Sequence, residues 1–171
     1  MTFQKIALDT IHAKVHAGRM FVFSTVTATY TGTTPIDIHV TTATAGCHLK
    51  VEGASGGDAI LSLYEAPVTS TTGWLSVSQN RNRFSSGSTA LTTFRVNPTV
   101  TTVGTLIFTK LIPGGTGASS QGGDGEPFGE IVLSTNQTYL VRLQNLTTTQ
   151  PGGIEAHFYE LASGETAGGL G

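Results

Sequence analysis

One short pattern occurs twice in this chain, and it limits the folds that the chain can adopt. In each copy a segment of alternating side chains ends at a proline, a run rich in Thr and Val follows, and a glycine stands six residues after the proline. The copies are 61–75, with Pro67 and Gly73, and 94–106, with Pro98 and Gly104. Proline has no N–H and therefore ends backbone pairing, and glycine best tolerates a turn with positive φ. Each copy predicts a strand, a crossing segment and a turn.

The composition also favours strands over helices. Charged residues make up 12% of the 171 residues and hydrophobic residues 38%, while 22 residues are glycine. Few segments could form a helix with a solvated face, whereas the many β-branched residues suit strands. We expect an all-β protein, an antiparallel β-sandwich with either a jelly-roll-like or an immunoglobulin-like topology.

The chain is expected to form one domain with an extension at each end, because its length allows a core without disulfides or metals. Residues 1–18 are predicted to be an extended N-terminal arm, although their apolar residues also fit a short helical face. Residues 19–161 are predicted to form the single β-sandwich domain, and 162–171 a Gly-rich tail with little to bury.

Alternation within the predicted strands selects the core. The apolar residues expected there include Phe21, Leu49, Leu63, Leu106 and Val141. The strand at 46–53 is separated by a Gly-rich connection from the strand at 59–65, which predicts a hairpin between them.

The charge pattern argues against several classes of partner. A net charge of −2 and a pI near 6.2 give no basic footprint for nucleic acid. The first twenty residues carry several charges and no long apolar run, so neither a signal peptide nor a membrane span is expected. Cys47 is the single cysteine, which excludes an intrachain disulfide and favours a buried thiol.

No motif for catalysis stands out, and we expect neither an enzyme nor a cofactor. The chain has no Gly-x-Ser-x-Gly elbow and no phosphate-binding loop between a strand and a helix. His12 and His16 would share a face of a helix, with Asp9 as a third metal ligand, but ordinary polar roles are the simpler interpretation. The expected catalytic, cofactor-binding and metal-binding residues are therefore none.

One cluster suggests a contact surface. Asn80, Arg81, Asn82 and Arg83 place two basic side chains and two amides within four residues. Such groups can bind carboxylates or backbone carbonyls on a partner protein. The alternative is a solvated loop whose arginines pair within the chain.

The order of these features resembles a family of tailed-bacteriophage virion proteins, the small β-sandwich head proteins of the decoration or cement type. The resemblance spans roughly residues 12 to 160. It rests on His16-Ala17-Gly18 before Phe21, Leu63-Tyr64-Glu65-Ala66-Pro67 with Gly73, Asn80-Arg81-Asn82-Arg83, Pro98 with Gly104-Thr105-Leu106, the Gly-rich segment before Gly129-Glu130, Thr138-Tyr139-Leu140-Val141-Arg142-Leu143, and Phe158-Tyr159-Glu160.

The resemblance implies a protein on the outer surface of the phage capsid. Its expected partners are the major capsid protein and further copies of itself, usually as a trimer, with no nucleic acid and no membrane involved. In this role it would clamp neighbouring capsid subunits, and the cluster from Asn80 to Arg83 would form part of the capsid contact.

A carbohydrate- or receptor-binding module of a tail or head fibre is the competing hypothesis. Sugar sites commonly expose an aromatic face, and Trp74 is the only tryptophan. Because Trp74 follows the glycine of the first repeat, packing in the core or turn is equally compatible with the sequence.

Overall fold

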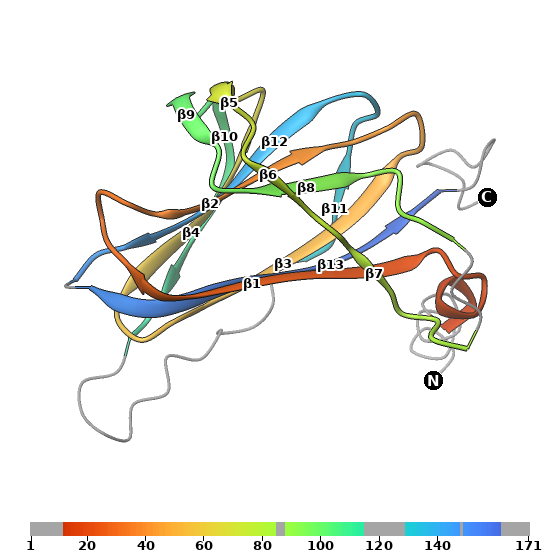
Figure 1. Ribbon diagram of the computed structural model, residues 1–171, viewed down its shortest axis with the longest axis horizontal. Helices are drawn as coiled ribbons and strands as arrows, with labels where there is room; N and C mark the ends of the chain where they lie inside the picture. Colours follow the sequence, from red (N-terminus) through yellow and green to blue (C-terminus); the bar gives the residue numbers. More distant parts are fainter. Residues whose placement is uncertain (1–11, 85–87, 115–128, 148, 162–171) are drawn as a thin grey trace.

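The computed structural model describes residues 12–84, 88–114, 129–147 and 149–161 (Figure 1). Two sheets pack face to face, and every strand pairing is antiparallel, which confirms the predicted β-sandwich. Sheet A contains, in spatial order, β11 (Ile131–Leu133), β3 (Cys47–Ser55), β13 (Gln150–Glu160), β1 (Met20–Tyr30) and β7 (Gln79–Asn80). Sheet B contains β10 (Thr105–Ile112), β4 (Ala59–Glu65), β12 (Thr138–Asn145), β2 (Ile36–Thr41), β8 (Thr93–Val96) and β6 (Trp74–Ser76). A third, two-stranded sheet pairs β5 (Val68–Thr71) with β9 (Thr99–Thr102).

The strand connections follow a jelly roll. Strands β1 and β3 both pair with β13 in sheet A, while β2 and β4 both pair with β12 in sheet B. Strands β11 and β10 then add to β3 and β4. This winding distinguishes the fold from the immunoglobulin-like alternative. Residues 66–104, called the insertion below, stand between β4 and β10 and extend both sheets.

The predicted hairpin between β3 and β4 is wrong. Strand β3 lies in sheet A and β4 in sheet B, so the connection through Gly56 and Gly57 passes between the sheets. Each strand already has a neighbour on both sides, β13 and β11 for β3 and β12 and β10 for β4. Residues distant in the sequence thus outcompete the local partner.

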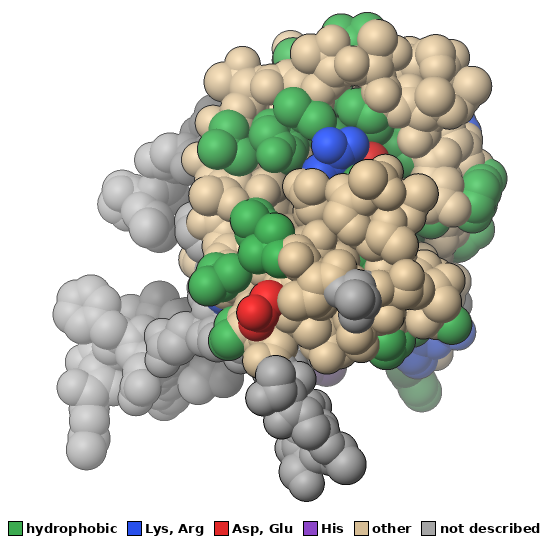
Figure 2. Space-filling model, turned by 90° about the vertical axis from the view of Figure 1, so that its left-hand side faces the viewer, with side chains coloured by type: hydrophobic (Ala, Val, Ile, Leu, Met, Phe, Trp, Pro, Cys, Tyr) green, Lys and Arg blue, Asp and Glu red, His purple; other side chains and the backbone are tan. Residues whose placement is uncertain are grey.

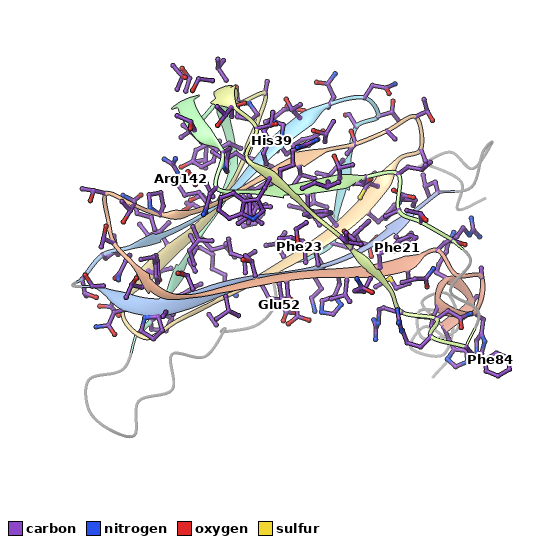
Figure 3. The ribbon with its side chains drawn as sticks, viewed as in Figure 1. Phe21, Phe23, His39, Glu52, Phe84 and Arg142 are labelled. Atoms are coloured by element: carbon purple, nitrogen blue, oxygen red, sulfur yellow. The ribbon has the colours of Figure 1, made fainter. Side chains whose placement is uncertain are left out.

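The core lies between the two sheets and is built around four phenylalanines. Phe21 stacks on Phe158 at 5.4 Å between ring centroids, Phe158 contacts Phe94 at 4.9 Å, and Phe94 stacks on Phe23 at 4.8 Å. This chain of rings joins sheet A to sheet B, and Figure 3 shows Phe21 and Phe23 pointing into the space between them. The Cys47 thiol is also buried in the core, as expected.

Four of the five core residues predicted by alternation are buried, and Leu106 is the exception. Leu106 is 50% exposed, because the register of β10 against β4 shifts between Leu106 and Phe108. Ile107 is the extra residue of this bulge, and a single extra residue reverses which side chains face inward. Phe108 therefore occupies the core in place of Leu106.

The two copies of the repeat exchange partners in the fold. The first copy leaves β4 and returns as β6 beside β8, while the second leaves β8 and returns as β10 beside β4. The crossing segments are the paired strands β5 and β9. Figure 1 places these strands on the side of sheet B that faces away from sheet A. On that outer face of sheet B, His39 and Leu140 pair across β2 and β12 and are only 4% and 0% exposed.

The N-terminal segment differs from the predicted irregular arm. Residues 12–16 are helical, while residues 1–11 lie outside the described part of the chain, as does the predicted tail at 162–171. Gly18, with φ of 66°, ends the helix. The N–H of Gly18 donates to the carbonyl of Val15, and the N–H of Arg19 donates to that of Lys14, both at 3.0 Å. This pair of bonds satisfies helix carbonyls that would otherwise lack donors.

Candidate functional site

The insertion carries much of the exposed apolar surface. Among the described residues, six of the twelve large exposed hydrophobic side chains belong to residues 66–104. They are Val68, Trp74, Leu75, Val77, Phe84 and Leu91. A segment that adds exposed apolar groups to an otherwise complete sandwich is where binding surfaces are expected. Two features of the insertion have a defined geometry: a loop at 81–84 and a groove beside Trp74.

Asn80 anchors the loop. Its side chain is only 6% exposed, and its Nδ2 donates to the carbonyl of Gly18 at 2.7 Å and to that of Ser88 at 3.2 Å. Its Oδ1 accepts from the backbone N–H of Asn82 at 2.8 Å. Asn80 therefore joins the start of the loop and Ser88 to the segment that precedes β1.

Asn82, two residues after Asn80, forms a second anchor of the loop. Its Nδ2 donates to the carbonyl of His16 at 3.0 Å, which ties the loop to the N-terminal helix, and its Oδ1 accepts from the N–H of Phe84 at 3.2 Å. Arg81 and Arg83 are exposed. The predicted polar cluster thus divides into two asparagines that hold the loop and two arginines on the surface, one of which, Arg83, donates to Gln79 at 3.3 Å.

Phe84 completes this surface and was missed as a contact residue by the sequence reasoning. Its side chain is fully exposed, and Figure 3 shows it pointing away from the body of the molecule. An aromatic residue directly after a basic cluster was the available signal, because Arg and aromatic side chains dominate protein contact surfaces. We call Arg81, Arg83 and Phe84 the docking loop.

The groove lies between the edges of the two sheets and has a volume of about 560 Å³. One wall is formed by β1 and the following turn, and the other by the start of β6 and the turn after β8. Its lining consists of Thr25, Val26, Thr27, Thr29, Tyr30, Thr34, Pro35, Ile36, Asp37, Trp74, Val96, Asn97 and Pro98.

The position of Trp74 at the groove is set by its strand pairing and by the glycine that precedes it. It pairs with Val96 across β6 and β8. The preceding Gly73 has φ of 77°, and a Cβ on it would collide with the carbonyl oxygen of Val96. The indole is nevertheless 60% exposed, so neither core nor turn packing covers it.

The groove is electrically neutral along its described lining. Asp37 is its one charged residue, and Arg142 binds that carboxylate through Nε and Nη2, both at 2.7 Å. The hydrogen bonds to Asp37 raise the pKa of Arg142, so the guanidinium keeps its positive charge beside the Asp37 carboxylate and offsets it. Figure 2 shows the side of the molecule at the left of Figure 1, where uncharged polar atoms and separate hydrophobic patches predominate over charged side chains.

In two other polar clusters the side chains contact one another. On the outer face of sheet A, the Tyr159 hydroxyl lies 2.8 Å from both Glu130 Oε1 and His48 Nδ1, and His48 also contacts Glu130. His12 and His16 share a helix face and approach to 2.8 Å between their Nε2 atoms, while Asp9 lies outside the described residues.

No group of three or more His, Cys, Asp or Glu side chains among the described residues is placed to hold a metal ion. Within the same residues, no helix combines the length and the apolar character needed to cross a membrane.

Comparisons of the chain with protein-family models, curated proteins and solved structures found no match. The geometry of the insertion and the resemblance in sequence pattern are therefore the basis for a functional proposal.

Proposed function

We propose that this protein is a non-enzymatic decoration protein of a tailed-phage capsid. It binds the outer capsid surface through the docking loop and stabilises contacts between major capsid subunits. The observation that carries the proposal is Phe84, a fully exposed aromatic side chain that follows two exposed arginines, Arg81 and Arg83, on a loop anchored by Asn80 and Asn82.

The anchoring favours binding to another protein. A rigid loop loses little conformational entropy on docking, so more of the contact energy contributes to affinity. A phenyl ring that enters a pocket, with guanidinium groups around it to bind carboxylates, is a common arrangement of strong contact residues. The jelly roll itself occurs in viral capsid proteins and in lectins, so it is compatible with this role without selecting it.

Assembly into a trimer would strengthen attachment, because several docking loops would then engage the capsid together. Strand β10 supplies a candidate contact between copies. It forms one edge of sheet B and exposes Leu106, Ile107 and Leu111. An open strand edge with apolar side chains is well suited to pairing with a second chain.

Purified protein added to particles that lack it tests the docking loop. Phe84→Ser should reduce cosedimentation with the particles at least tenfold, because it removes the apolar anchor. Val77→Ser is the matched control, since Val77 is also exposed in the insertion but lies outside the docking loop. Equal binding of Phe84→Ser and the unaltered protein would contradict the proposal.

The location of the protein on the particle is a separate test. Antibody label on intact particles should form a regular lattice over the head, and heads without the protein should rupture at a lower temperature. Label confined to the tail or to fibre tips would overturn the decoration role.

Sedimentation equilibrium tests the oligomeric state. It should show a trimer that Leu111→Asp dissociates.

A further inference from the structure

We propose that the groove beside Trp74 is a binding site for a neutral oligosaccharide. This site is separate from the docking loop and does not depend on the decoration role. Its elements are one exposed indole, a row of threonines, one exposed side-chain amide and a lining without net charge.

The indole provides the platform. An exposed tryptophan exposes apolar area, which soluble proteins usually retain for a ligand or partner. Pyranose rings present flat faces of C–H groups that stack on aromatic rings, while their hydroxyls remain available for hydrogen bonds. Gly73 and the pairing of Trp74 with Val96 fix the backbone that carries the ring, so the platform is formed before a ligand arrives.

The opposite wall supplies hydrogen-bonding groups. On this side β7 pairs only with Phe21 and Val22 among the described residues, so the edge of β1 is open along the groove from Thr25 onward. Thr25, Thr27 and Thr29 line the groove there. The Thr27 hydroxyl donates to the carbonyl of Thr29 at 3.1 Å, while the hydroxyls of Thr25 and Thr29 can both donate and accept, as the hydroxyls of a sugar require.

Asn97 adds a side-chain amide that extends from a backbone position held at the groove. Its φ of 54° is left-handed, and its N–H donates to the carbonyl of Asp37 at 3.1 Å. Within the described part of the chain the side-chain amide has no hydrogen-bond partner, and the residue is exposed at the groove. An amide that both donates and accepts is suited to a pair of adjacent sugar hydroxyls.

The charge of the lining selects a neutral ligand. Asp37 is already neutralised by Arg142, so the groove offers no cation to a phosphate or a uronic acid. A volume of about 560 Å³ falls within the range of about 300–1,000 Å³ that is typical of small-ligand sites.

Trp74 gives the test a direct readout, because it is the only tryptophan in the chain. We would titrate the intact protein with cellohexaose, maltohexaose, mannohexaose and N-acetylchitohexaose, and probe an array of neutral glycans. A bound saccharide should shift the tryptophan emission to the blue, since stacking removes water from the indole. Calorimetry should give a matching saturation curve.

Three variants locate the site. Trp74→Ala should weaken binding at least tenfold, equivalent to about 1.4 kcal/mol. Asn97→Gly keeps the left-handed backbone, removes the amide and should weaken binding severalfold. Leu75→Ser is the matched control, because adjacent side chains on a strand point to opposite faces, and it should bind normally.

The proposal would be overturned if no neutral glycan bound, or if Trp74→Ala bound as well as the unaltered protein. A response to an extended peptide and to no saccharide would also overturn it, and would instead make the β1 edge a site for strand addition. Phe84→Ser should retain saccharide binding, while Trp74→Ala should retain particle binding, so failure of either proposal would be distinguishable from failure of the other.

Discussion

Ala66 and Asn97 adopt the same left-handed backbone conformation, with φ of 54° at each, and each directly precedes a proline. They occupy equivalent places in the two copies of the repeat. Gly73 of the first copy packs against the turn at Asn97, and Gly104 of the second packs against the turn at Ala66. Each turn is thus closed by the glycine of the other copy, which makes the two copies mutually dependent.

Substituting Gly73 should destabilise the protein strongly. In Gly73→Ala the new Cβ would meet the backbone carbonyl of Val96, at a residue whose φ of 77° is unfavourable for alanine. We expect a loss of about 2–4 kcal/mol in the free energy of unfolding, measured by urea titration. Gly129→Ala is the control, because its Cβ would meet nothing within 4 Å. Similar stabilities for the two variants would contradict the packing described.

Replacing Ala66 should have the opposite effect. Alanine is strained at a φ of 54°, whereas asparagine tolerates this conformation, as it does at Asn97. Ala66→Asn should therefore raise the free energy of unfolding by about 0.5–1 kcal/mol. A lower melting temperature than that of the unaltered protein would show that the turn does not retain this conformation.

The bulge in β10 predicts unequal effects for two neighbouring apolar residues. Phe108→Ala should cost about 3–5 kcal/mol, since Phe108 is buried in the core. Leu106→Ala should change stability by less than about 1 kcal/mol, because Leu106 is half exposed. Chemical denaturation of both variants measures the difference, and the reverse order would place the bulge elsewhere.

His39 should make stability depend on pH. Burial, and secondarily the charge of Arg95, lower the pKa of His39 below its usual value of 6.5. The unfolded chain therefore binds a proton near pH 6.5 that the folded chain accepts only at lower pH. The contribution of His39 to stability is complete above pH 6.5 and declines as the pH falls through that value, by at most about 1.4 kcal/mol per pH unit.

Urea titrations between pH 8 and pH 5 measure this decline. His39→Gln should reduce the slope below pH 6.5, whereas His157→Gln, on the outer face of sheet A, should retain the slope that His39 causes. An unchanged slope in His39→Gln would exclude His39 as its source.

Cys47 should be unreactive in the folded protein. Burial raises the pKa of its thiol to about 12, so almost no thiolate is present at neutral pH. A thiol-specific reagent such as dithiobisnitrobenzoate should modify Cys47 at pH 8 only after urea is added. Rapid labelling without denaturant would show that the core opens readily at β3.

Local patterns determined the strands and the turns of this protein. Alternation, the two prolines and the positive φ of Gly73 and Gly104 depend on residues adjacent in the sequence, so they could be recognised from the sequence alone. The asparagines that anchor the docking loop were found in the same way, as members of a polar cluster, although their bonds to Gly18 and His16 were not predictable.

Only the tertiary structure decided the strand neighbours and the burial of several side chains, because both depend on which distant segments of the chain meet. The burial of Phe108 in place of Leu106 follows from a bulge against β4, and the separation of β3 from β4 follows from pairing with β13 and β12. Trp74 is exposed because it lies at the open edge between the sheets, facing a groove whose other wall is β1. No local pattern contains that relationship, since only the packing of the two sheets brings those residues together.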